Sequence, residues 1–228
     1  MNGGKLMFNS KYSNVLTVIL IIIIILIVGL LGFLGYDMYR KYFITKDTSS
    51  FIEEYDGQIG NKVKENVINE IDDGTLVNLV IDNTTSSQGG SSDNKIMYKE
   101  FEVVGKIEIP KTNIQYPILA KLTRRSIEVA VAVLYGPGIN EPGNTIILGH
   151  NYRNGLFFSN NKKLVNGDKI YITDNSGRTL EYVVYDIFQT TESDTSFYNV
   201  DTGGIPEISL QTCTDDSKLR LIVRARAQ

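Results

Sequence analysis

The stretch "ISLQTCTDDSKLRLIVRARAQ", Ile208–Gln228, predicts two β-strands joined by a polar turn. Apolar and β-branched residues fill both ends, and "TDDSK" between them is typical of a turn. Side chains alternate along a strand, so Leu221 and Val223 are expected to face a core. Arg220 and Arg224 are expected on the opposite face, with Arg226 beside them.

The same pattern extends over residues 96–228. Short runs rich in Val, Ile and Tyr are separated by Gly, Pro, Asn and Asp, which predicts six to eight strands in a mainly β, closed or nearly closed barrel. Only "TRRSIEVAVAVL", residues 123–134, is predicted to be a short helix. The other predicted strands lie in "EVVGKIEIPKTNIQYPIL" (102–119), "TIILGHN" (145–151) and the hairpin "DKIYITDNSGRTLEYVVYDIFQTT" (168–191).

An uncharged apolar run, "VLTVILIIIIILIVGLLGFLG", occupies residues 15–35. As a helix it would be roughly 31 Å long, which matches the hydrocarbon core of a bilayer. The run is too long for a typical signal peptide, so a retained anchor at 15–36 is expected. The flanks do not decide its orientation, because two lysines precede it and Arg40, Lys41 and Lys46 follow it.

Residues 37–95 are predicted to be a stalk and linker. Ile59, Val63, Val67, Ile68 and Ile71 recur at near-helical spacing, which predicts a helix that either packs on the main domain or stands alone in solvent. Residues 83–94 contain no apolar side chain and predict a flexible linker.

The composition excludes several classes of function. The net charge of −3 gives no indication of nucleic-acid binding. One cysteine and one histidine exclude a multi-cysteine zinc site and a His-rich metal site. No cofactor is therefore expected.

The lone cysteine and the lone histidine both end predicted strands. Cys213 closes "ISLQTC" and His150 closes "TIILGH", each followed by a polar loop where site residues are common. A cation such as Arg220 favours the thiolate of a nearby cysteine, histidine can move protons, and arginine can stabilise an oxyanion. Together these residue types suit acyl transfer.

The chain resembles the sortases, the cell-wall transpeptidases of Gram-positive bacteria. "SLQTC" resembles their TLxTC motif, "GNTIILGHN" the segment around their histidine, and "LRLIVRA" the strand that bears their arginine. "GKIEIPKTNIQYPIL" and "KKLVNGDKIYI" resemble two further segments, and all five occur in family order. The resemblance implies an eight-stranded barrel with one or two short helices, which follows the N-terminal transmembrane helix.

The resemblance also implies roles for three residues. Cys213 would be the nucleophile that attacks a Thr–Gly bond of an LPxTG-like sorting signal and forms a thioacyl intermediate. His150 would be the general acid and base, and Arg220 would hold the substrate and the oxyanion. The partners would be sorting-signal proteins, an amine acceptor from a cell-wall precursor or a pilin, and membrane lipid around the anchor. Such an enzyme is a hydrolase-class cysteine peptidase.

The implied domain order is a cytoplasmic N-terminus at 1–14, an anchor at 15–36, an extracellular stalk and linker at 37–95, and a catalytic domain at 96–228. The short interval between His150 and Cys213 and the lack of a lid motif favour class A or D over B or C. Glu192 and Asp194 precede the cysteine strand, where some class A enzymes bind calcium, but no metal site is assigned. Two alternatives stay open: a thiol hydrolase of the same fold, and a non-catalytic anchored barrel that binds a surface protein.

Overall fold

The computed structural model describes residues 10–71 and 95–228. The chain forms two compact units. The first unit is Met1–Ile44 and the second is Thr45–Gln228. The predicted linker at 83–94 lies outside the described residues. The boundaries predicted after residues 14, 36 and 95, which separate the N-terminus, the anchor, the stalk and the catalytic domain, stay predictions.

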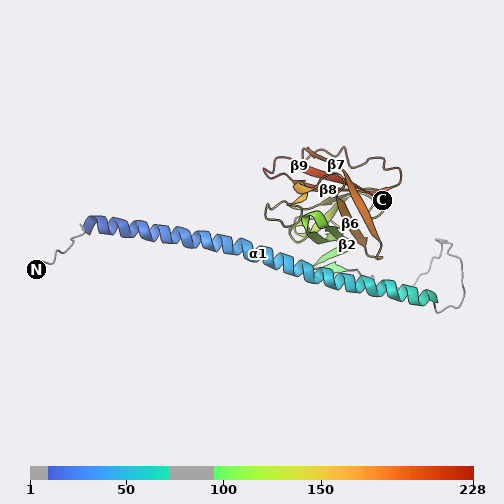
Figure 1. Cartoon of the computed structure of the whole chain (residues 1–228), viewed down its shortest axis with the longest axis horizontal. Helices are drawn as coiled ribbons and strands as arrows, with labels where there is room; N and C mark the ends of the chain where they lie inside the picture. Colours follow the sequence, from blue (N-terminus) through green and yellow to red (C-terminus); the bar gives the residue numbers. More distant parts are fainter. Residues whose placement is uncertain (1–9, 72–94) are drawn as a thin grey trace, which may run out of the picture. The chain divides into compact units, whose positions relative to one another are not determined.

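One long helix, α1 (Ser10–Ile71), begins in the first unit and ends in the second (Figure 1). Within the first unit its apolar side chains are exposed on every side, from Ile19 to Leu34. A helix that is apolar all round is typical of a membrane span. By length and composition it is, within the described ranges, the one helix able to cross a bilayer.

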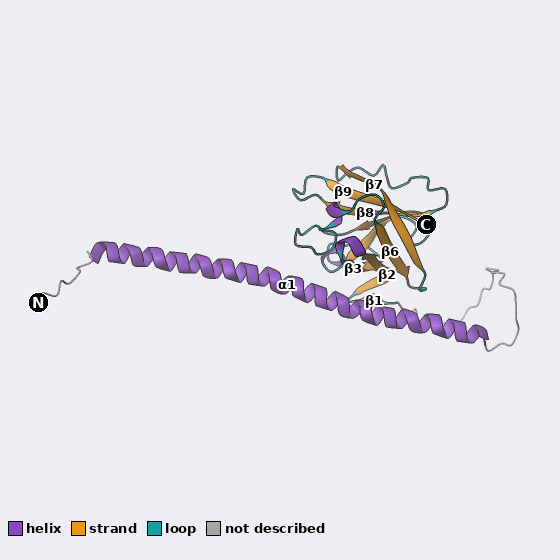
Figure 2. Cartoon of the chain, viewed as in Figure 1, coloured by secondary structure: helices purple, strands orange, loops and turns teal. Residues whose placement is uncertain are grey.

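The second unit contains a closed barrel of eight strands (Figure 2). The strand order β2-β3-β4-β5-β8-β9-β7-β6 returns to β2 through the β2–β6 pairing, and the two-residue strand β1 adds to β2. This confirms the predicted eight-stranded barrel. The strands are β1 (Met97–Tyr98), β2 (Phe101–Ile109), β3 (Ile114–Leu119), β4 (Val131–Tyr135), β5 (Gly143–Leu148), β6 (Lys169–Asp174), β7 (Thr179–Thr190), β8 (Pro206–Cys213) and β9 (Arg220–Ala227).

The interior is filled by the alternate apolar residues of these strands. Ile107, Ile147 and Leu210 are fully buried, as are Ile118, Ile170, Ile172 and Val223. The closed barrel leaves no long unpaired strand edge, so the packed interior holds every strand in a fixed register. The short 3₁₀ turns η1 (Pro110–Thr112), η2 (Ser126–Glu128) and η3 (Asn161–Lys163) lie in the connections.

The helix predicted at residues 123–134 is wrong. Only Ser126–Glu128 form a helical turn, and Val131–Tyr135 form β4, which pairs with β3 in parallel and with β5 in antiparallel fashion. The valines of this segment are β-branched and suit a pleated surface between two strands. The strand predicted to end at His150 ends two residues earlier, at Leu148.

The helix predicted within residues 37–82 is present as far as Ile71, and its stretch in the second unit packs on the barrel. Tyr55 is fully buried, and its hydroxyl donates to the Asn175 side chain at 3.0 Å. Asp56 forms an ion pair with Lys106 of β2. Of the two alternatives for this helix, packing on the main domain is the one observed.

Gly177, in the turn between β6 and β7, has no room for a side chain. A Cβ there would lie 2.7 Å from Val63 Cγ2 and 3.1 Å from Ile59 Cγ2 of α1. Gly167 has a similar positive φ, +94° against +90°, but nothing lies within 4 Å of its Cβ position. The two glycines therefore differ in their contact with the helix.

We expect Gly177→Ala to destabilise the Thr45–Gln228 unit more than Gly167→Ala. In both variants an alanine at positive φ strains the backbone, which costs about 1 kcal/mol. At position 177 alone, overpacking against the helix costs a further ~1–3 kcal/mol. Urea unfolding of residues 45–228 measures the difference. Val63→Ala removes the nearest methyl group and should restore most of the excess loss; equal losses in the two glycine variants would contradict helix docking.

Candidate active site

The register of three neighbouring strands brings the predicted site residues together. Cys213 and Arg220 are direct partners at the ends of β8 and β9. On the other side of β8, β5 runs parallel with Leu148 opposite Gln211, and the Gly149 amide donates to the Gln211 carbonyl at 3.1 Å. The chain beyond β5 therefore carries His150 to the same sheet end as Cys213.

Asn151 joins the two loops directly. Its side-chain amide donates to the Cys213 carbonyl at 2.9 Å and to Asp215 Oδ1 at 3.0 Å. Its own side-chain oxygen accepts from the Arg153 amide, which closes a tight turn. The residue after His150 thus fixes the loop of the histidine against the strand end of the cysteine.

His150 lies between an acid and an aromatic ring. Glu128 Oε1 is 3.4 Å from His150 Nε2, close enough for charge attraction although the geometry is not that of a hydrogen bond. The Tyr152 hydroxyl donates to the other oxygen of Glu128, and its ring centre is 4.8 Å from that of His150. The Glu128 carboxylate and the Tyr152 ring therefore both lie close to the imidazole of His150.

Arg220 has a different partner from the other two arginines of β9. Arg220 lies beside Cys213, and its Nη2 contacts Glu192 Oε2 at 2.8 Å. Arg224 and Arg226 instead bind Glu207, whose side chain is 1% exposed, at 3.2 and 2.5 Å. Arg220 is therefore the arginine of this strand that lies beside the cysteine.

The two loop acids considered for calcium have partners within the protein. Glu192 pairs with Arg220, and Asp194 accepts from the Thr190 hydroxyl and the Ser196 amide. Hydrogen bonds from Thr190 and Ser196 hold the pKa of Asp194 below its usual value. Neither acid belongs to a cluster of three metal-ligand side chains within the described part of the chain.

The loop between β7 and β8, residues 191–205, lies over the outer face of the sheet. Phe197 is buried against Ile146 and Ile222, and its carbonyl accepts from Asn144 Nδ2 at 2.7 Å. Ser209 in turn donates to the Asn144 side-chain oxygen at 3.0 Å. This buried polar link holds the loop on the sheet.

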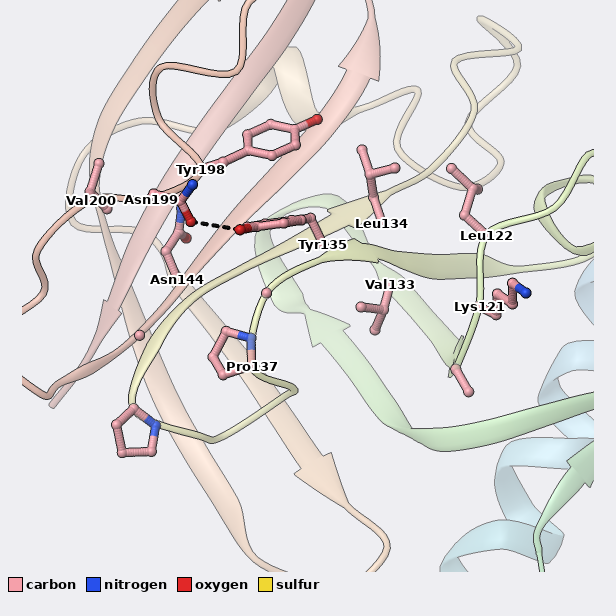
Figure 3. Close-up of a pocket in the computed structure, with 14 residues that line it drawn as sticks. Lys121, Leu122, Val133, Leu134, Tyr135, Pro137, Asn144, Tyr198, Asn199 and Val200 are labelled. Carbon is pink, nitrogen blue, oxygen red and sulfur yellow. Dashed lines mark hydrogen bonds between the residues drawn. The ribbon is translucent and has the colours of Figure 1, made fainter.

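An outer pocket of about 720 Å³ opens between this loop and β4. Figure 3 shows Tyr135 and Asn199 joined across it by a hydrogen bond, which measures 2.7 Å. Its apolar and aromatic walls include Leu122, Val133, Leu134, Pro137 and Tyr198. A second pocket, of about 520 Å³, is lined by Cys213 itself.

A family model described as "Sortase domain" matches residues 107–228, which include the cysteine, the histidine and the arginine. The chain belongs to the sortase family.

Individual relatives agree with this assignment. Sortase A of Bacillus anthracis is 31% identical over 125 residues, which are 54% of this chain and 58% of that protein. The structure of sortase A from Corynebacterium diphtheriae aligns with a TM-score of 0.51 at 29% identity, over 57% of this chain and 62% of that one. A Clostridium perfringens sortase D5 transpeptidase aligns with a TM-score of 0.51 at 30% identity, over 56% and 79%.

The similarity thus spans less than two thirds of the first two relatives. Class C enzymes are also similar, since a pilus-related sortase C of group B Streptococcus has a TM-score of 0.50 at 29% identity over 55% and 67% of the two chains. The preference for class A or D therefore stays a prediction.

Several residues around the site were not predicted. Glu128 lies in the segment expected to be helical, and its approach to His150 depends on the turn before β4. Asn151 follows the histidine in sequence, but its bond to Cys213 is visible only in the fold. Alternation along the cysteine strand places Glu207 on the same face as Cys213, and this signal was overlooked. In the fold Glu207 lies opposite Arg226.

We expect Arg224→Ala and Arg220→Ala to differ in their effect on stability. Arg224→Ala leaves the buried carboxylate of Glu207 short of a partner, which should lower the free energy of unfolding by about 3 kcal/mol. Arg220→Ala frees the exposed Glu192 and should cost about 0.5 kcal/mol. Urea unfolding of residues 45–228 tests this, and equal losses would contradict the division of roles.

Proposed function

We propose that this sortase is a membrane-anchored cysteine transpeptidase that cleaves an LPxTG-like sorting signal through a thioacyl intermediate. The observation that carries the proposal is the meeting of the chain's one cysteine and one histidine at a single sheet end, tied by the Asn151 bond to the Cys213 carbonyl. Arg220, paired in register with Cys213, supplies the cation.

The reaction follows from these three groups. The Cys213 thiolate attacks the carbonyl of the Thr–Gly bond, and Arg220 stabilises the negative charge that develops on the oxygen. His150 gives a proton to the departing amine, which leaves a thioester on Cys213. An amine from a cell-wall precursor or a pilin then attacks the thioester, and His150 accepts the proton that the amine loses.

The outer pocket suits the apolar part of the sorting signal. Two of its lining residues, Asn144 and Tyr198, are hydrogen-bonded to Ser209 and Gln211 of β8. Ser209 and Gln211 alternate with the inward side chains of β8, as Cys213 does. Leu134, Pro137 and Tyr198 offer apolar walls for a Leu-Pro segment, while Tyr135 and Asn199 offer polar groups at the rim.

The location follows from the same proposal. Sortase substrates are on the outside of the cell, so the barrel would be extracellular, the apolar part of α1 would be a single-pass anchor in lipid, and the N-terminus would be cytoplasmic. The exposed apolar surface of α1 in the first unit supports an anchor of this kind.

We expect Cys213→Ala to abolish peptide cleavage while the barrel stays folded. Because the chain has one cysteine, a thiol reagent labels that position alone and reports its reactivity without interference. The test incubates the detergent-solubilised full chain with a library of LPxTG-like peptides and measures cleavage and acyl-enzyme formation by mass spectrometry. His150→Ala should lower cleavage by about 10³-fold and Arg220→Ala by about 10²-fold.

The matched control is Arg226→Ala, which removes a neighbouring guanidinium that binds Glu207 and should leave the cleavage rate near that of the unaltered chain. Cleavage by Cys213→Ala would overturn the proposal. Cleavage with water as the acceptor, whatever amine is added, would instead identify a thiol hydrolase. Peptide binding that survives the loss of Cys213, without any cleavage by the unaltered chain, would identify a binding barrel.

A further inference from the structure

The two nitrogens of the His150 ring lie in different surroundings. Nε2 is buried and makes no hydrogen bond to any described residue, although 31% of the side chain is exposed. A general acid or base must come within hydrogen-bond reach of the atom whose proton it moves. A substrate that binds from solvent cannot approach the buried Nε2, so Nδ1 is the ring nitrogen left for proton transfer.

Glu128 lies beside the buried nitrogen of this ring. Its Oε1 is 3.4 Å from His150 Nε2, and its Oε2 accepts from the Tyr152 hydroxyl. The Tyr152 ring also contacts the imidazole, with 4.8 Å between the two ring centres. An ionised carboxylate can only accept hydrogen bonds, so its contact with Nε2 is favourable when that nitrogen carries a proton.

The turn that presents Glu128 is held by its own hydrogen bonds. Ser126 is fully buried, and its hydroxyl accepts from the Thr123 amide at 2.7 Å and donates to the Lys121 carbonyl at 3.0 Å. The Thr123 hydroxyl accepts from the Ser126 amide at 2.9 Å. With the backbone fixed in this way, a small side-chain movement closes the gap to Nε2. Hydrogen bonds between catalytic groups are often long before a substrate binds and shorten with it.

We propose that Glu128 is a positioning residue, which keeps the proton on Nε2 of His150 and so makes Nδ1 the nitrogen that exchanges protons with the substrates. The hydrogen bond made by one nitrogen of an imidazole decides which form the other nitrogen takes. A carboxylate behind a histidine fixes both its tautomer and its ring orientation in this way. This inference rests on the proposed function, because it concerns the proton transfers of that reaction.

Each proton transfer then has a defined route. When the tetrahedral intermediate collapses, the proton on Nδ1 passes to the departing amine nitrogen, the C–N bond breaks with its electron pair going to that nitrogen, and a thioester to Cys213 remains. The acceptor amine later attacks the thioester carbon, the C–S bond breaks with its electron pair going to sulfur, and Nδ1 takes up the proton that the amine loses. Nε2 keeps its proton, donated toward Glu128, through both steps.

The test compares two leaving groups. The detergent-solubilised full chain is given an LPxTG-like peptide, or the same peptide with a thioester in place of the scissile Thr–Gly amide, and acyl-enzyme formation is followed by mass spectrometry. Glu128→Ala should lower the maximal rate with the amide about ten- to hundredfold and leave the half-saturating concentration unchanged. A thiolate departs without a proton, so the rate with the thioester should stay close to that of the unaltered chain.

Two further variants distinguish positioning from a structural role. Glu128→Gln keeps an acceptor oxygen without the charge, so it should lose only about two- to fivefold with the amide. In a His150→Ala background, Glu128→Ala should cause no further loss, because Glu128 acts through the ring that has been removed. The Glu128 side chain is 48% exposed, so neither substitution should change the melting temperature appreciably.

The matched control is Glu100→Ala. The Glu100 side chain is 51% exposed and pairs with Arg125, which lies in the same connection between β3 and β4 as Glu128. The substitution therefore removes a similarly exposed carboxylate that contacts this connection without facing the histidine. It should leave the rates with both peptides unchanged.

The outcomes separate this inference from the proposed function. If the unaltered chain forms no acyl-enzyme with the amide peptide, the proposed function itself fails. If it does form one, three results would each overturn the inference: an unchanged rate of Glu128→Ala with the amide, an equal loss with the thioester, or a further loss in the His150→Ala background.

Discussion

The position of β8 between β5 and β9 is the constraint on which the rest of the barrel's chemistry depends. Leu210 of β8 lies opposite Ile147 on one side and Val223 on the other, and all three are fully buried. A slip of one residue would turn Leu210 outward and Cys213 into the barrel. The apolar core therefore sets the direction of the cysteine, although no core residue belongs to the site.

Charge supports the same register at the far end of these strands. Glu207 is buried, and it is held by two arginines of β9 and by the Tyr185 hydroxyl. Removing such a carboxylate from water is costly, so the pairing of β8 with β9 is strongly preferred in the one register that satisfies it. The arginines of one strand thus divide between holding the sheet together and facing the cysteine.

Local patterns were enough to predict most of the barrel but not the contacts between distant segments. Alternation and turn residues located β2, β3, β6, β7, β8 and β9, because each strand buries one face. Residues 131–135 resembled a helix locally, and only pairing with β3 and β5 makes them a strand. The meeting of Tyr55 with Asn175 and of Glu128 with His150 depends on the tertiary fold, which leaves no periodic signal in the sequence.

The docking of the loop at residues 191–205 has a consequence for how this protein can change over evolutionary time. The loop is attached through the Phe197 ring and carbonyl, the Tyr198 ring and Asn199. At its tip, Asp201 and Gly203 are exposed, and the Gly203 amide donates to the Asp201 side chain. Substitutions or insertions at the tip can therefore remodel the mouth of the outer pocket without disturbing the barrel, so new recognition preferences can arise on an unchanged scaffold.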